Sequence, residues 1–151
     1  MKTVKGDLIK LAEDGIFDVI IHGCNCFCTM GAGIAKTIKQ KFPKAYEADL
    51  ATEKGDKTKL GTITWSESQT RHGELIIVNG YTQYYWGGKG RQADYDAIKS
   101  VFETIKEKFS GKRIGYPAIG AGLAGGDWTI ISEIIRKALE GEDHTFVEFQ
   151  R

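Results

Sequence analysis

The chain has 151 residues, of which 41% are hydrophobic and 27% are charged, so it is long enough for the core of one domain and short for two. Its formal net charge of +1 argues against a dedicated nucleic-acid-binding protein, which usually carries a strong basic excess. There is no signal peptide and no apolar run near the roughly 18 residues of a membrane span, and the three cysteines are odd in number and crowded together, so we expect a reduced, cytoplasmic monomer without a membrane segment.

The first part of the chain predicts two strands separated by a turn. Residues 3–4 are a short strand candidate, and Gly6 and Asp7 indicate a turn in which Asp7 either caps a helix or contacts a ligand. Residues 19–21 form an unbroken apolar run, which is typical of a central strand covered on both faces. We therefore expect His22 just beyond this strand, at the edge where open α/β sheets bind their ligands.

The middle of the chain predicts helices followed by a pair of strands. Apolar residues at helical spacing indicate a helix over residues 34–42, which Pro43 ends. A second short helix is expected over residues 46–52. Residues 60–66 and 74–81 then have the composition of two strands joined by a hairpin or a short connection.

The last part of the chain returns to alternating helices and strands. An apolar stripe with spacings of three and four predicts a helix over residues 94–109. A strand over residues 114–119, a helix over 127–139 and a closing strand over 145–149 follow. This alternation predicts an α/β protein, a three-layer α/β/α sandwich with a mixed, mostly parallel central sheet, as a single domain over residues 1–151.

The loop over residues 81–91 is aromatic, glycine-rich and basic. Aromatic rings among basic residues can stack single-stranded bases, and glycines can let a lid close over a small ligand. A surface loop with its rings packed against the domain has the same composition. These alternatives stay open, although the small net charge makes nucleic acid the least expected partner.

Two glycine-rich turns each connect a predicted strand to a predicted helix. The first contains Gly31 and Gly33, and the second covers residues 120–126. A strand that ends in a glycine turn at a helix start directs free backbone N–H groups and the positive end of the helix dipole at one point, which favours an anion. We predict that both turns contact the same phosphorylated ligand.

Neither turn fits the common nucleotide motifs. The second matches G-x-G-x-x-G, but no strand-ending acidic residue follows about 20 residues later, as the dinucleotide fingerprint requires. The first has Met30 and Ala35 where a P-loop needs glycines around its lysine. The sequence therefore implies neither a dinucleotide cofactor nor ATP hydrolysis, and we expect no cofactor.

Polar chemistry is concentrated beside the first turn. His22 and Asn25 lie three residues apart before the helix-opening glycines, and three cysteines alternate with other residues from position 24 to 28. The second ligand pair that structural zinc sites normally supply is missing, so we expect no metal site. Asp127 stands at a helix start, where it caps the helix or orients His22 if the two turns are adjacent.

Four motifs occur in order: V-K-G-D-L at 4–8, V-I-I-H-G-C-N at 19–25, M-G-A-G-I-A at 30–35 and Y-P-A-I-G-A-G-L-A-G-G-D-W at 116–128. Together they resemble the motifs of a macrodomain, a family that binds ADP-ribose in a cleft over the sheet.

The resemblance also implies roles for individual residues. Asp7 would hydrogen-bond the adenine, Leu8 would flank it, and Asn25 would face the distal ribose. The diphosphate and ribose contacts would come from the two turns, at Gly31, Ala32, Gly33, Ile34, Ala35, Ile119, Gly120, Ala121, Gly122, Leu123, Ala124 and Gly125.

Within the family, the H-G-C-N segment with F-P-K-A at residues 42–45 is most similar to the branch of phosphatases that act on ADP-ribose 1″-phosphate. This similarity implies hydrolysis to ADP-ribose and phosphate, with His22, Asn25 and Asp127 as the catalytic residues. His22 would activate water, attack phosphorus or protonate the leaving oxygen.

Other macrodomain hydrolases have acidic or basic residues that this chain lacks. One type has an aspartate at the position of Ala35, and another has an aspartate near Ala124 and a lysine near Gly80 and Tyr81. Two alternatives to the phosphatase stay open. The chain could be a binding module that reads ADP-ribose without chemistry, or a hydrolase that removes ADP-ribose or acyl groups from protein or nucleic acid by substrate-assisted chemistry.

Overall fold

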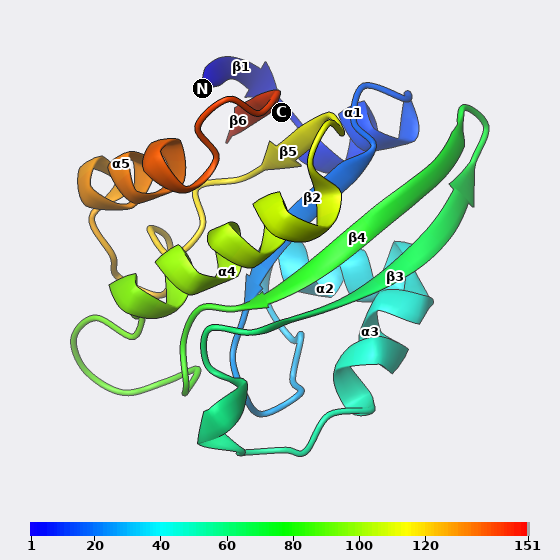
Figure 1. Ribbon diagram of the computed structural model, residues 1–151. Coiled ribbons are helices and arrows are strands. Elements are labelled where there is room, and N and C mark those ends of the chain that lie inside the picture. The colour runs from blue at the N-terminus through cyan, green and yellow to red at the C-terminus, as the bar shows by residue number, and fades with distance from the viewer. Residues whose placement is uncertain (151) are drawn as a thin grey trace.

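A computed structural model describes residues 1–150 of the chain (Figure 1). The elements in order are β1 (Lys2–Gly6), α1 (Leu8–Glu13), β2 (Val19–Cys24), α2 (Gly33–Lys41), α3 (Pro43–Leu50), a 3-10 turn (Lys57–Lys59), β3 (Ile63–Thr70), β4 (Gly73–Tyr81), α4 (Tyr95–Phe109), β5 (Ile114–Tyr116), α5 (Trp128–Ala138) and β6 (His144–Phe149). None of these helices, over the described residues, is long and apolar enough to cross a membrane.

The strands form one six-stranded sheet in the order β1-β6-β5-β2-β4-β3. All neighbours pair in parallel except β3 and β4, which form an antiparallel hairpin. In Figure 1 this hairpin is the long green pair at one edge of the sheet. The predicted mixed, mostly parallel sheet is therefore confirmed.

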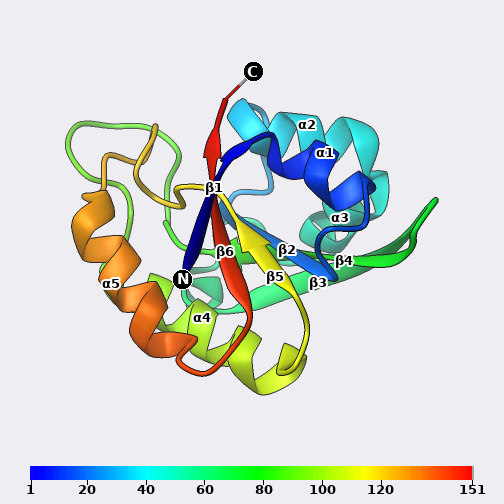
Figure 2. The same cartoon turned by 90° about the horizontal axis from the view of Figure 1, so that it is seen from above.

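Helices cover both faces of the sheet, as the two views show (Figures 1 and 2). On one face, α1, α2 and α3 pack through residues such as Ile9, Ile38 and Ala45 against Ile20 and Ile77 of the sheet. On the other face, α4 and α5 pack against residues of β2, β4 and β5 in a larger apolar core. The central strands are buried on both sides, which explains their continuous apolar runs and confirms the three-layer sandwich.

Several element boundaries differ from the sequence prediction. The chain forms the short helix α1 directly after Asp7, whose side chain accepts hydrogen bonds from the backbone N–H groups of Ile9 and Lys10. Pro43 does not only end α2: it occupies the first turn of α3, where its missing N–H costs nothing. Strand β2 continues three residues beyond Ile21, to Cys24, and this extension changes the site.

Replacing Gly115 by alanine is expected to destabilise the fold. A Cβ atom at this position of β5 would lie 2.7 to 2.8 Å from three ring atoms of Phe17, so the ring or the strand must move. We expect a loss of about 1–3 kcal/mol in the free energy of unfolding, as for other overpacked cores. Urea unfolding measures it, with Gly87→Ala as control because the nearest atom there is 3.5 Å away. Equal stability of the two variants would contradict this packing.

Candidate functional site

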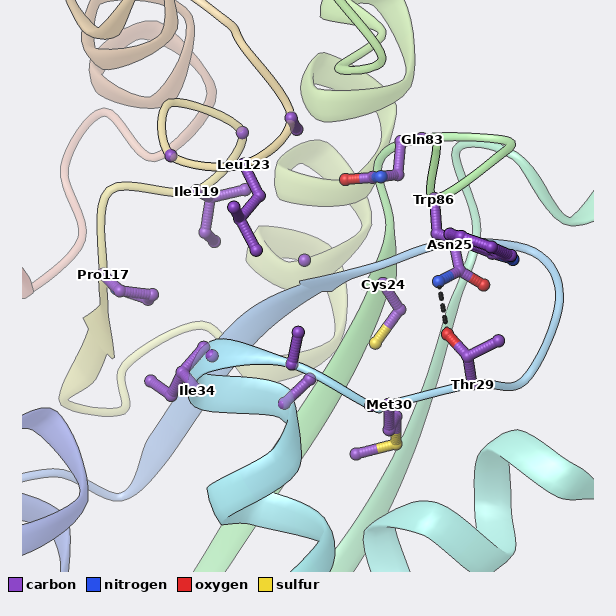
Figure 3. A pocket seen from close by; sticks show the side chains of 18 of the residues that line it. Cys24, Asn25, Thr29, Met30, Ile34, Gln83, Trp86, Pro117, Ile119 and Leu123 are labelled. Atoms are coloured by element: carbon purple, nitrogen blue, oxygen red, sulfur yellow. Dashed lines mark hydrogen bonds between the residues drawn. The ribbon is translucent and has the colours of Figure 1, made fainter. Parts of the chain in front are cut away.

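A pocket of about 640 Å³ opens at the carboxyl edge of the sheet (Figure 3). Its walls are the end of β2, the segments that follow β2, β4 and β5, the start of α2 and one residue of α3. The lining residues are Gly23, Cys24, Asn25, Thr29, Met30, Gly31, Ala32, Gly33, Ile34, Ala35, Asp49, Gln83, Trp86, Pro117, Ala118, Ile119, Gly120, Gly122, Leu123 and Ala124.

The first glycine turn brings the start of α2 to the pocket. Ala32 is the N-cap residue of α2 and has no side chain that could accept a hydrogen bond from the first turn. The N–H groups of Gly33, Ile34 and Ala35 therefore have no capping acceptor, because a helix leaves its first N–H groups without internal partners. Together with the helix dipole they form a site that favours an anion.

The second glycine turn is closed by a hydrogen bond between its two ends, and three backbone N–H groups within it have no partner among the described residues. The N–H of Gly126 donates to the carbonyl of Gly120 at 2.7 Å, and a Cβ at Gly126 would lie 2.5 Å from that oxygen, so only glycine fits. Within residues 1–150, the N–H groups of Gly122, Leu123 and Ala124 donate to no other protein group. Both turns line the same pocket, which confirms the prediction that they meet in space.

Asn25 lies at the end of the pocket next to the loop that follows β4. Its side chain accepts a hydrogen bond from the N–H of Phe27 and donates one to Thr29 Oγ1, at 2.8 and 2.7 Å. These two bonds fix the orientation of the amide. Trp86 lines the same pocket as Asn25 (Figure 3), and it is 58% exposed.

The aromatic loop over residues 81–91 is partly packed and partly open. Tyr84 donates a hydrogen bond from its hydroxyl to the carbonyl of Gly55 and packs edge-on against Phe27. Tyr85 also packs against Phe27, and it contacts Trp86. The loop thus holds one indole ring at the pocket while its other rings pack against the domain.

The structure places His22 differently from the sequence prediction. Because β2 continues to Cys24, His22 lies within the strand opposite Asn79, is 0% exposed and does not line the pocket. The predicted position beyond the strand end, with the imidazole facing the ligand, is wrong. Cys24, whose Sγ atom lies 3.5 Å from His22 Nε2, is between the ring and the pocket.

The tautomer of His22 follows from its partner. The side-chain N–H₂ of Asn79 donates to the carbonyl of Ala45 and to Thr64 Oγ1. Its Oδ1 atom is therefore the acceptor of the 2.7 Å bond to His22 Nε2, so Nε2 carries a proton. Burial lowers the pKa of His22 to about 4, and the bond to Asn79 offsets only part of that effect.

Five other residues of the predicted site do not line the pocket. Asp127 caps α5 through the N–H of Thr129, and the ring of His22 bonds Asn79 instead, so the predicted pairing of Asp127 with His22 is wrong. Leu8 is buried in the core at 4% exposure, and Asp7 caps α1. The remaining two are Ala121 and Gly125.

Several lining residues were missed from the sequence. Trp86 belongs to a loop whose composition fitted a lid, a base-stacking surface or a packed surface loop, and no pattern gave the direction of its ring. Asp49 gave no signal, because a single aspartate on a short helix usually faces solvent. It is instead 1% exposed, and burial raises its pKa.

No group of three His, Cys, Asp or Glu side chains in residues 1–150 is arranged to hold a metal ion.

Comparison with known proteins identifies related sequences. The family model described as "Macro domain" matches residues 21–135. An uncharacterized 17.5 kDa protein of Enterobacteria phage T4 is 39% identical, over 89% of this chain and 87% of its own length. The ADP-ribose 1″-phosphate phosphatase of Debaryomyces hansenii is 26% identical over 91% and 93%. The DNA ADP-ribosyl glycohydrolase of Mycobacterium tuberculosis is 25% identical over 89% of this chain, but this chain spans only 37% of its length.

Solved structures share the fold. The macrodomain of M. tuberculosis DarG superimposes with a TM-score of 0.76 at 18% identity, covering 99% of this chain and 97% of that chain. Thermosipho africanus DarTG, solved in complex with ADP-ribose, gives a TM-score of 0.74 at 18% identity, covering 99% of this chain and 42% of that chain.

Protonation of His22 is expected to destabilise the fold in acid. The pKa of the ring is about 4 in the folded state against an ordinary value of 6.5, so as the pH falls the unfolded chain takes up the proton first. The stabilisation is complete above pH 6.5 and decreases toward pH 4. Between about pH 7 and about pH 5 this group should remove about 2 kcal/mol from the free energy of unfolding, measured in urea.

Ring NMR titration is the control for this assignment. Burial also lowers the pKa of His144 to about 4, so its ring adds to the loss over the same range, and the NMR signals separate the two. A midpoint near 6.5 for His22 would show that its ring is accessible to solvent and would contradict the buried geometry.

Proposed function

Because this chain belongs to the macrodomain family, we propose that its pocket binds ADP-ribose and that the protein hydrolyses ADP-ribose 1″-phosphate to ADP-ribose and phosphate. The observation that carries the proposal is the convergence of two sets of free backbone N–H groups on one pocket. Such groups bind a diphosphate through hydrogen bonds without any positively charged side chain. The pocket of about 640 Å³ also lies within the usual range for small-molecule sites.

The order of the strands gives the ligand a direction. Asp7, which the family resemblance assigns to the adenine, follows the edge strand β1, whereas Asn25 follows β2 on the far side of β6 and β5. In the proposed complex the adenine lies at the β1 edge, the diphosphate lies between the two turns, and the distal ribose lies beside Asn25 and the loop after β4. Asp7 and Leu8 do not line the central pocket, so the adenine would bind outside it.

The relatives' names support a phosphate ester as the substrate. The D. hansenii phosphatase matches over 91% of this chain and 93% of its own length. Backbone N–H groups of the same two turns can also stabilise the charge on a phosphoryl group during transfer. His22 takes no direct part in this proposal, because its ring is buried below Cys24.

A second candidate is the removal of ADP-ribose from nucleic acid. The M. tuberculosis relative is named a DNA ADP-ribosyl glycohydrolase. The exposed Trp86 lines the same pocket as Asn25, so a base attached to the distal ribose could stack on its indole ring. A non-catalytic reader of ADP-ribose is the third possibility, and assays of turnover separate it from the other two.

Placing a carboxylate at the start of α2 is expected to weaken ADP-ribose binding. Ala32 is exposed and has the extended conformation of an N-cap residue, so aspartate fits there and would accept hydrogen bonds from the free N–H groups. It would also repel the diphosphate. We expect Ala32→Asp to raise the dissociation constant by roughly tenfold or more without loss of stability, measured by calorimetry.

The matched control is Gln40→Glu, which adds the same charge at the exposed far end of the same helix. It should leave the dissociation constant within about twofold, since surface charges a Debye length apart are screened. Equal affinities of the two variants would show that the start of α2 does not hold the diphosphate.

Incubation with ADP-ribose 1″-phosphate tests the proposed reaction directly. We expect release of inorganic phosphate and accumulation of ADP-ribose, because both turns would hold the substrate while water displaces the ester. Parallel reactions contain ADP-ribosylated single-stranded DNA and ADP-ribosylated peptide. Binding of ADP-ribose with no product in any reaction would make the protein a reader, and product from the DNA alone would favour the second candidate.

A further inference from the structure

The pocket contains few groups that could transfer a proton. Among the described residues that line it, Asp49 is the one carboxylic acid and Cys24 is the one thiol, and there is no basic side chain. Hydrolysis of an ester requires a proton for the oxygen that leaves. Burial raises the pKa of the Cys24 thiol well above its usual range, which makes it a poor nucleophile and a poor acid.

Asp49 lies in the last turn of α3, with its two carboxyl oxygens in different surroundings. Oδ1 accepts a 2.8 Å hydrogen bond from the hydroxyl of Tyr81. Oδ2 is buried and has no hydrogen-bond partner in the protein, although the residue lines the pocket. A buried oxygen without a partner costs stability, so this arrangement indicates a partner that arrives with the ligand.

The hydrogen bond to Asp49 is the end of a buried chain of polar groups. His22 Nε2 donates to Asn79, Asn79 donates to Thr64, and Thr64 Oγ1 lies 3.0 Å from the hydroxyl of Tyr81. Because Thr64 Oγ1 accepts from Asn79, its own hydroxyl proton is free to point at Tyr81. The hydroxyl of Tyr81 accepts this bond from Thr64 and donates its own proton to Asp49. The chain orients the carboxyl group of Asp49, and it gives the buried imidazole of His22 a positioning role.

Asp49 lies at the end of the pocket to which the proposed complex assigns the distal ribose. Helix α3 packs against β3 and β4, the last strands in the sheet order, on the opposite side from β1 and Asp7. The Cys28 thiol donates to the backbone carbonyl of Asp49 at 3.3 Å, so Asp49 adjoins the segment that carries Asn25 and Thr29. The bond to be broken in an ADP-ribose ester is at this end.

We propose that Asp49 is the general acid and base of this site, in the hydrolysis of ADP-ribose 1″-phosphate that the previous section proposes and on which this inference rests. The proton on Oδ2 passes to the oxygen that bridges C1″ and phosphorus as the oxygen–phosphorus bond breaks. The oxygen of a water molecule bonds to phosphorus, and a proton of that water returns to the carboxylate. The products are ADP-ribose and phosphate, and Asp49 regains its starting state.

The electrostatic surroundings suit this role. Burial raises the pKa of Asp49, while the hydrogen bond from Tyr81 and the charge of Lys59 lower it and limit the rise. The ammonium group of Lys59 is held nearby by Thr52 Oγ1 at 2.8 Å. A carboxyl group tuned in this way keeps its proton closer to neutrality than a solvent-exposed aspartate does.

The first test is the variant Asp49→Asn, which keeps the shape of the side chain and an acceptor for Tyr81. We expect phosphate release to fall by roughly a hundredfold or more, with the ADP-ribose dissociation constant within about threefold of wild type. Tyr81→Phe is the matched control because it removes the hydrogen bond but keeps the carboxyl group. The hydrogen bond from Tyr81 lowers the pKa of Asp49, so its removal in Tyr81→Phe should raise that pKa. The pH at which activity falls as Asp49 loses its proton should therefore be higher in Tyr81→Phe than in wild type. Asp49→Asn has no carboxyl group, so this fall should be absent from its pH profile.

The second test does not depend on turnover. NMR titration of the Asp49 carboxyl carbon, with and without ADP-ribose, should show a shifted midpoint when ligand is bound, because the distal ribose then faces Oδ2. An unchanged midpoint, or wild-type turnover in Asp49→Asn, would overturn the role of Asp49. Failure of the wild-type protein to release phosphate counts instead against the proposed function, and in that case the NMR titration decides whether Asp49 faces the ligand.

Discussion

The parallel pairing of β2 with β4 is the constraint on which the rest of the site depends. Six residue pairs join them, from Val19 opposite Ile76 to Cys24 opposite Tyr81. Because the strands are parallel and in register, their carboxyl ends lie at the same edge, and the segments that follow bring Asn25 and Trp86 to one pocket. The same pairing buries every side chain of β2 that precedes the pocket.

The pairing of β2 with β4 also produces the series of buried hydrogen bonds beneath the pocket, which begins at His22. His22 lies directly opposite Asn79, and the hydrogen bond between them continues through Thr64 to Tyr81 and Asp49. Buried polar groups stabilise a fold only when all of them have partners, and in this chain Asp49 Oδ2 is one of three buried side-chain oxygens in residues 1–150 without one. The polar chain therefore lies beneath the pocket and ends at a carboxyl group, one oxygen of which has no hydrogen-bond partner among the described residues.

The sequence predicted the layers, the sheet type and the meeting of the two turns, because glycines and apolar periodicity are local signals. It misplaced His22, because the apolar run stops at Ile21 while the strand continues, and the partner that makes this possible, Asn79, is 57 residues away. Asp49 was missed for the same reason: its hydrogen-bond partner Tyr81 lies on β4, far along the chain from α3. Local patterns predict secondary structure and turns, whereas the partners of buried polar groups depend on tertiary contacts.

Backbone NMR during titration with ADP-ribose tests the central claim, that two turns far apart in sequence form one cradle for a diphosphate. The account predicts that the largest amide shifts fall on Gly33, Ile34 and Ala35 and on Gly122, Leu123 and Ala124, and that they saturate together with a single dissociation constant. Shifts confined to one turn, or concentrated in the groove between α4 and α5, would contradict it.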